Sequence, residues 1–282
     1  GKEGRVVRKG RIKQSIAFWC FNVGGDKWDL ERTCRVAVKL GCPSVELVLG
    51  DDHKIVRKYG LTCAIAQIDL SPDPPFVKGF NNPAHWPRVI AATKKAIDEA
   101  NAYKSPCVIA FTGYSAKDPA NPDGPKWTLE EGADNCVAGF KQIIGYAEKK
   151  KVNICLEVLN TRDDSHPMKG HPGYMGNHTD WCIDVVKRVG SRRMKLLFDI
   201  YHAQIMDGDI IRRIREHADY IGHVHIAGCP GRGELDDKQE LNFKPIMEAL
   251  VDVGYTGYVG HEYIPTRDAM TGLIEAVALC DV

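Results

Sequence analysis

The sequence lacks several features that would place it in a specialised class of protein. No apolar run approaches the roughly 20 residues that a helix needs to span a bilayer. None of its ten cysteines forms a C-x-x-C pair, and most lie inside apolar runs, as at Cys107, Cys136 and Cys155. Cysteines scattered in this way are typical of small buried side chains, so we expect neither a disulfide framework nor a zinc–thiolate site.

The charge balance lacks an excess of either sign, with 38 Lys and Arg against 37 Asp and Glu. Proteins that bind nucleic acid through its phosphates usually carry a basic excess, so nucleic acid is not an expected partner. A membrane is not expected either, because no spanning segment is present. The hydrophobic content of 44% and the charged content of 27% are those of an ordinary globular protein.

Basic residues gather in the first 13 positions, which hold six Lys or Arg against one acid, Glu3. A solvated arm and the remainder of a trimmed leader both fit this stretch. We assign residues 1–14 to a basic N-terminal arm and residues 15–282 to one catalytic domain. We expect a cytoplasmic protein, with export after removal of a leader as the alternative.

Short β-rich runs alternate with helical stretches along the chain. Eight runs are expected to be strands: Ser15–Phe21, Ser44–Val48, Thr62–Ile68, Cys107–Thr112, Val152–Glu157, Met194–Asp199, Ile221–Ala227 and Tyr258–Tyr263. Helices are expected after Asp51 and at Leu30–Lys39, Pro83–Tyr103, Leu129–Lys150, Thr179–Val189, Asp209–His217, Phe243–Val251 and Ala269–Leu279. No G-x-G-x-x-G follows the first strand, which argues against a dinucleotide-binding sheet. Eight alternating units predict an α/β fold, a single-domain (β/α)8 TIM barrel.

The fifth to eighth predicted strands each end at a residue that can bind a metal. These residues are Glu157, Asp199, His225 and Glu262. Side chains alternate along a strand, so all four are expected to face the barrel axis at one rim. Three carboxylates packed there without a cation would repel one another. Any one of them alone would be explained as a cap or an ion pair, but four together predict a site for one divalent cation, Mg²⁺, Mn²⁺, Co²⁺ or Zn²⁺.

Four further polar residues are expected near this rim. His202 follows the sixth strand and is interpreted as a donor to a substrate hydroxyl, with a polar residue at a helix start as the alternative. Arg232, in the Gly/Pro-rich loop after the seventh strand, is interpreted as a binder of an anion or hydroxyl, with an exposed loop arginine as the alternative. His223 lies one layer below His225 and would orient it or contact substrate. Glu46, inside the second strand, would bind substrate or support a metal ligand, unless it forms a core ion pair.

Three segments of the C-terminal half, FDIYHAQIMDGDI, GHVHIAGCPGR and YVGHEYIPT, resemble the hydroxypyruvate isomerase family. That family belongs to the xylose isomerase-like barrels, which also include D-tagatose 3-epimerase. The resemblance is strong from about Val152 to Leu273. Before that it is limited to the rhythm of the barrel and the G-x-x-x-V-E-L pattern at Gly41–Leu47.

The resemblance implies an enzyme that interconverts a small hydroxy-aldehyde and a hydroxy-ketone by proton transfer through an enediolate. It implies that Glu157 and Glu262 are the catalytic pair and that Asp199 is a metal ligand. It also implies that His202 and Arg232 bind the substrate. The expected partner is a small carbohydrate or hydroxy-keto acid, and a homo-oligomer is compatible with the sequence.

Two departures from the family pattern leave the substrate open. Hydroxypyruvate isomerases carry Gln at the place of His225, whereas the sugar epimerases carry His, so a ketose epimerase is the main alternative. The loop Asn160–Asn177 is longer than its counterparts, and two of its histidines, His166 and His171, are candidates to line the pocket. An endonuclease IV-like nuclease would need additional His and Asp ligands, but the fourth strand ends in FTG and no D-x-H follows the seventh. A sugar-binding barrel without activity would lack one of the paired carboxylates, and dehydration of a polyol acid stays open.

Overall fold

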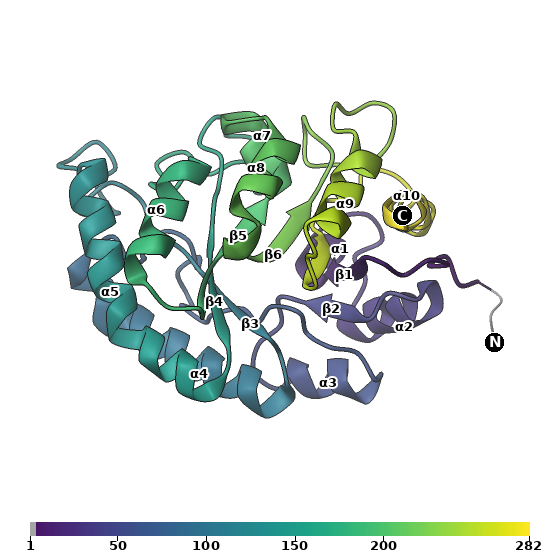
Figure 1. The fold of residues 1–282 in the computed structure, drawn as a ribbon, viewed down its shortest axis with the longest axis horizontal. Coiled ribbons are helices and arrows are strands. Elements are labelled where there is room, and N and C mark those ends of the chain that lie inside the picture. The colour runs from purple at the N-terminus through teal and green to yellow at the C-terminus, as the bar shows by residue number, and fades with distance from the viewer. Residues whose placement is uncertain (1–3) are drawn as a thin grey trace.

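The computed structural model describes residues 4–282, in which parallel strands form a ring enclosed by helices (Figure 1). Within that range the named strands are β1 (Lys13–Ala17), β2 (Ser44–Glu46), β3 (Cys107–Ala110), β4 (Asn153–Glu157), β5 (Met194–Asp199), β6 (Ile221–Ile226) and β7 (Tyr258–His261). They form one sheet in the order β2-β1-β7-β6-β5-β4-β3, and every pairing is parallel. Parallel neighbours require a crossover between them, and helices supply it.

Residues 62–66 close the ring between the two end strands β2 and β3. Thr62 bridges Ser44 of β2 and Ala66 bridges Val108 of β3, both in the parallel sense. The Ala66 amide also donates to the Cys107 carbonyl at 2.9 Å. The predicted strand Thr62–Ile68 therefore occupies the eighth position, although it makes isolated bridges instead of a continuous ladder. The expected (β/α)8 barrel is confirmed.

Helices cover the outside of the ring (Figure 1). Their bounds are α1 (Phe18–Val23), α2 (Leu30–Leu40), α3 (Asp52–Lys58), α4 (Trp86–Tyr103), α5 (Leu129–Lys150), α6 (Thr179–Val189), α7 (Ile200–Met206), α8 (Ile210–His217), α9 (Phe243–Asp252) and α10 (Ala269–Cys280), with 3-10 turns at Pro83–His85 and Ala218–Tyr220. Side chains fix several helix starts: Thr128 and Glu131 form a reciprocal capping box on α5, and Asp29 caps α2. The short helices α1 and α7 were not predicted.

The predicted strand Ser15–Phe21 is wrong in its second half. The strand ends at Ala17, and the chain turns at once into α1. Phe21 of α1 is fully buried, stacked 5.2 Å from Trp28 and edge-on to Tyr263 at 5.4 Å. The apolar run is therefore the buried part of a short helix, and a run this short does not distinguish helix from strand. The turn brings Trp19 over the mouth of the barrel.

The described N-terminal stretch runs beside the C-terminal helix α10 (Figure 1). The amides of Arg8, Lys9 and Gly10 donate to the Asp281 carboxylate at 2.6–2.9 Å. Residues 8–10 of the predicted arm are therefore held in place, and its last residues enter β1; residues 1–3 lie outside the described part. All ten cysteines are buried and free. Among the helices of residues 4–282, none is both long and apolar enough to cross a bilayer.

The buried pair of His261 and Gln14 predicts a loss of stability in acid. His261 is fully buried, with Nε2 2.6 Å from Gln14 Oε1. Burial lowers the pKa of His261 to about 4 from an ordinary 6.5. Because the unfolded chain takes up this proton first, the contribution to stability is complete above pH 6.5 and falls as the pH drops toward 4.

The free energy of unfolding should fall between pH 7 and pH 4.5 in both proteins. We expect the fall to be about 2 kcal/mol smaller in His261→Gln than in the parent. Urea unfolding followed by circular dichroism at both pH values measures the difference. The other buried histidines titrate in both proteins and cancel in this comparison. Equal losses in the two proteins would contradict the prediction.

Candidate active site

Four side chains meet at the carboxyl ends of β4 to β7. Glu157 ends β4, Asp199 ends β5, His225 lies near the end of β6, and Glu262 follows the last residue of β7. His225 Nδ1 lies 3.1 Å from Glu262 Oε1, 3.6 Å from Glu157 Oε1 and 3.8 Å from Asp199 Oδ2. One ligand atom from each of the four lies within 4.8 Å of all the others. The convergence expected from the strand ends is therefore present in the structure.

This cluster fits a divalent cation on two counts. Two ligands that each lie about 2.1 Å from one ion are separated by about 3–4 Å, which is the spacing found around His225 Nδ1. His225 Nδ1 is buried and has no hydrogen-bond partner among residues 4–282. A buried imidazole nitrogen that faces three carboxylates is an arrangement typical of a metal ligand. Oxygen and nitrogen ligands of this kind suit several divalent ions and do not select one of them.

Burial and crowding shift the ionisation of the cluster in opposite directions. Burial raises the pKa of Glu157 and, with repulsion from Glu262, raises that of Asp199 well above its ordinary value. Burial would also raise the pKa of Glu262, but His225 and Arg232 together hold it well below normal. Burial would lower the pKa of His225, but Glu262 and Glu46 raise it well above normal. Without a cation the cluster therefore retains protons that a bound metal would displace.

Arg232 and Trp19 hold Glu262 from the side of the mouth. Arg232 donates to Glu262 Oε1 at 2.5 Å, and Trp19 donates its indole N–H to Glu262 Oε2 at 3.1 Å. The guanidinium also lies over the Trp19 ring at 5.2 Å and the Tyr201 ring at 5.5 Å. Another of its nitrogens donates to the Met168 carbonyl. Arg232 is consequently buried and fixed, unlike the exposed loop arginine that the sequence left as an alternative.

His202 lies beside Asp199 with one nitrogen engaged and the other directed to the cluster. Its Nδ1 accepts a hydrogen bond from the backbone amide of Asn160 at 3.1 Å, so the proton of the neutral ring resides on Nε2. Nε2 lies 3.9 Å from Asp199 Oδ2 and, within the described residues, has no hydrogen-bond partner. Burial, and then the Arg232 charge, lower the pKa of His202 well below normal. The ring is therefore a neutral donor beside the carboxylates.

A cavity of about 230 Å³ opens over the cluster. Its walls are Trp19, Leu47, Gln67, Pro75, Phe76, Ile109, Phe111, Glu157, Leu159, Met168, His171, Arg232 and Glu262. Most of these side chains are apolar, and Glu157, Arg232 and Glu262 bring charged groups of the cluster into the wall, as is usual in small-molecule sites. The volume suits a molecule on the order of ten non-hydrogen atoms, since each liquid water occupies about 30 Å³.

The loop between β4 and α6 supplies three cavity residues, Leu159, Met168 and His171. Asn160 shapes the loop, because its side-chain amide donates to the Lys169 carbonyl at 2.8 Å. The Tyr201 hydroxyl donates to the same carbonyl at 2.6 Å. The His171 ring meets Phe76 edge-on at 4.3 Å. Burial, followed by the Arg232 charge, lowers the pKa of His171 to about 3, so the ring stays neutral in the cavity.

The sequence named some of these residues and missed others. His171 was a candidate, and it lines the cavity, whereas His166 is exposed. Trp19 was missed because its segment was assigned to a strand, although an aromatic residue just after the first strand was a usable signal. Met168 and Gln67 carried no signal in the sequence.

The remaining two candidates, Glu46 and His223, lie beneath the cluster. Neither is among the residues that line the cavity within the described part of the chain. Both are fully buried, and Glu46 contacts His223 and His225 across the barrel interior. They are placed to support His225 from below and do not face a molecule in the cavity.

The fold and this cluster together define a TIM barrel with a candidate metal centre at its carboxyl end. The chain matches the model of the xylose isomerase-like TIM barrel family over residues 34–280 and belongs to that family. A putative hydroxypyruvate isomerase of Homo sapiens is 40% identical over 118 residues, which are 42% of this chain and 40% of the relative. The 2-oxo-tetronate isomerase of Cupriavidus necator is 37% identical over 142 residues, 49% of this chain and 52% of the relative. The matches thus span about half the length of these curated relatives or less.

Solved structures share the architecture over nearly the whole chain. An AP endonuclease of family 2 from Brucella melitensis superposes with a TM-score of 0.74 at 24% identity, covering 93% of this chain and 97% of the other. D-psicose 3-epimerase from Clostridium cellulolyticum H10, solved with D-tagatose, superposes with a TM-score of 0.71 at 17% identity, covering 96% of each chain. At these identities the superpositions establish the fold alone.

The protonated state of the cluster predicts that metal binding depends on pH. Because Glu157, Asp199 and His225 have raised pKa values, they must lose protons before they ligate a cation. We expect the apparent affinity for Mn²⁺ to rise between pH 6 and pH 8, with net proton release on binding. Calorimetric titration in two buffers of different ionisation enthalpy measures that release. Asp199→Asn should release fewer protons, and an affinity that does not change with pH would contradict the prediction.

Proposed function

We propose that this protein is a divalent-metal-dependent isomerase that interconverts a small hydroxy-aldehyde and a hydroxy-ketone. The observation that carries the proposal is the cluster of Glu157, Asp199, His225 and Glu262 beneath a small, mostly apolar cavity. The hydroxypyruvate and 2-oxo-tetronate isomerases among its relatives support the same reaction class. When bound, the cation would polarise the carbonyl and hydroxyl oxygens of the substrate.

Glu157 and Glu262 are the proposed proton carriers. Both line the cavity, and they approach it from non-adjacent strand ends. One carboxylate removes the proton from the hydroxyl-bearing carbon beside the carbonyl, and the substrate becomes an enediolate. The other carboxyl group returns a proton to the former carbonyl carbon, while the hydroxyl proton moves between the two oxygens. The substrate is thereby isomerised without net gain or loss of atoms or electrons.

Arg232 and His202 would bind the polar groups of the substrate. Arg232 lines the cavity and is held by Met168 and Glu262, so its guanidinium is presented in one orientation. His202 is buried beside Asp199 and is not itself a cavity-lining residue, but its Nε2–H has no acceptor among the described residues and is the donor proposed for a substrate hydroxyl that reaches the cluster. His171 adds a neutral ring to the cavity wall, which tolerates an uncharged polar end of the substrate.

Ketose epimerisation is the second candidate. His225 favours it, because His stands here where the resemblance expects Gln in hydroxypyruvate isomerases. The same two carboxyl groups would serve, but the proton would return to the opposite face of the same carbon. The chemistry up to the enediolate is common to both reactions, and the products distinguish them.

The paired role of the glutamates predicts the behaviour of Glu157→Gln. We expect this variant to keep the fold, because it removes one of three crowded carboxylates, and to lose turnover by at least about 10²-fold. Isomerase assays with saturating metal and circular dichroism measure the two properties. Glu240→Gln, at an exposed position after β6, is the control and should retain full activity. Activity of Glu157→Gln close to that of the parent would remove Glu157 from the mechanism.

Proton transfer predicts solvent exchange in the product. We expect the metal-loaded protein, incubated in D₂O with small ketoses, hydroxy-keto acids and their aldehyde isomers, to place deuterium on the carbon that is reprotonated. Mass spectrometry and proton NMR of the products measure the label and its position. A product formed without label would indicate an internal hydride shift, and no turnover across the panel would sink the proposed function.

A further inference from the structure

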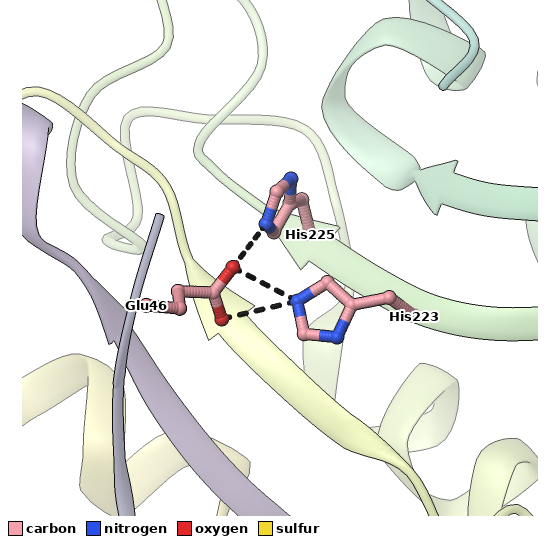
Figure 2. Close-up of side chains that lie close together, drawn as sticks. All are labelled: Glu46, His223 and His225. Carbon is pink, nitrogen blue, oxygen red and sulfur yellow. Dashed lines mark hydrogen bonds and ion pairs between the residues drawn. The ribbon is translucent and has the colours of Figure 1, made fainter. Parts of the chain in front are cut away.

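The imidazole of His225 has two functionally different sides. Nδ1 faces the three carboxylates of the candidate metal centre. Nε2 points in the other direction, to Glu46 Oε2 at 2.5 Å (Figure 2). A ligand imidazole can bind a cation only through a nitrogen that carries no proton, so the side that holds the proton decides whether Nδ1 is available.

Glu46 determines on which side of each ring the proton lies. Two histidine rings lie at hydrogen-bond distance from its carboxylate (Figure 2). His223 Nε2 is 2.9 and 3.0 Å from the two oxygens, and His225 Nε2 is 2.5 Å from one of them. An ionised carboxylate only accepts hydrogen bonds, so both rings must donate from Nε2. Both oxygens of the Glu46 carboxylate lie within 3.0 Å of an imidazole nitrogen, so the group is placed to accept from both rings.

The barrel wall is shaped to admit this contact. Glu46 projects from β2, whereas His225 lies on β6, and β7 separates β6 from β1 in the sheet. The residue paired with His225 on β7 is Gly260. A Cβ at this position would lie 2.4 Å from Glu46 Oε1 and 2.8 Å from His225 Cδ2. The space that glycine leaves is therefore the space that the carboxylate and the imidazole occupy.

We infer that Glu46, itself held by His223, is a positioning residue that keeps one His225 proton on Nε2 and directs Nδ1 to the cation, which displaces any proton that Nδ1 carries. This inference rests on the proposed metal dependence and deepens it. A carboxylate behind a ligand histidine fixes the ring and increases its basicity, and loss of such a partner typically costs about 10–100-fold in metal affinity. His223 does not contact the candidate metal centre itself; it acts through Glu46, whose carboxylate it holds by hydrogen bonds to both oxygens.

A second cation held by Glu46, His223 and His225 is the competing explanation, since these three also lie close together. Their separations argue against it. Atoms 2.5–3.0 Å apart are at hydrogen-bond distance, and two ligands about 2.1 Å from one ion seldom approach as closely as 2.5 Å. The proposal therefore requires one cation per chain.

The central experiment is a calorimetric titration of the full chain with Mn²⁺ at pH 8. We expect the parent to bind one ion, and Glu46→Gln to bind one ion about 10–100-fold more weakly, because an amide offers one acceptor where two donors need it. Glu99→Gln is the matched control, since Glu99 Oε2 also lies near a histidine, His53, at 4.0 Å but away from the metal centre. The control should bind as the parent does.

His223→Gln tests the order of the chain of contacts. It should weaken Mn²⁺ binding less than Glu46→Gln, and the double variant should be no weaker than Glu46→Gln alone, because His223 acts through Glu46. Additive losses would overturn the role assigned to His223. Thermal melting of each variant without metal confirms that the protein titrated is folded.

A measurement on the parent protein tests the inference if Glu46→Gln fails to fold. In ¹⁵N-histidine-labelled protein loaded with Zn²⁺, His225 should show a proton on Nε2 and a metal-shifted Nδ1, with its signals assigned by their loss in His225→Asn. Coordination through Nε2, two ions per chain, or unchanged affinity in Glu46→Gln would each overturn the inference while leaving metal dependence intact. If the parent binds none of Mn²⁺, Co²⁺ and Zn²⁺, the proposed function itself fails, and the inference with it.

Discussion

Three carboxylates are buried close together at the mouth of the barrel, and the side chains around them must offset their mutual repulsion. Glu157, Asp199 and Glu262 lie within a few ångströms of one imidazole and are shielded from water. Burying one unpaired charge is costly, and burying three of the same sign requires compensation. Arg232 and His225 compensate in part, through Glu262 above all. The negative charge that remains makes the arrangement suited to a cation.

Much of the barrel followed from the sequence because parallel strands buried on both faces are continuous apolar runs, and helices separate them. The failures have physical causes. Phe18–Val23 is apolar but only six residues long, and a helix of that length has no visible period. Residues 62–66 face two neighbours through isolated bridges, so their strand character depends on the edges of β2 and β3 and not on their own pattern.

The convergence of the four cluster residues was predictable because a barrel brings the carboxyl ends of its strands to one rim. What surrounds them was less predictable, since it depends on contacts between distant segments. Glu46 and His225 are 179 residues apart, and no local pattern signals that they touch. Trp19 reaches Glu262 only because the chain turns after β1, and Met168 reaches the cavity only through the conformation of the loop after β4.

The loop after β4 forms part of the cavity wall and also holds the Arg232 guanidinium. Met168 contributes its side chain to the cavity wall and its carbonyl to the Arg232 guanidinium, and the next residue, Lys169, receives the Tyr201 hydroxyl that lies under the same arginine. A change in the conformation of this segment would therefore alter the cavity wall and the position of the guanidinium together.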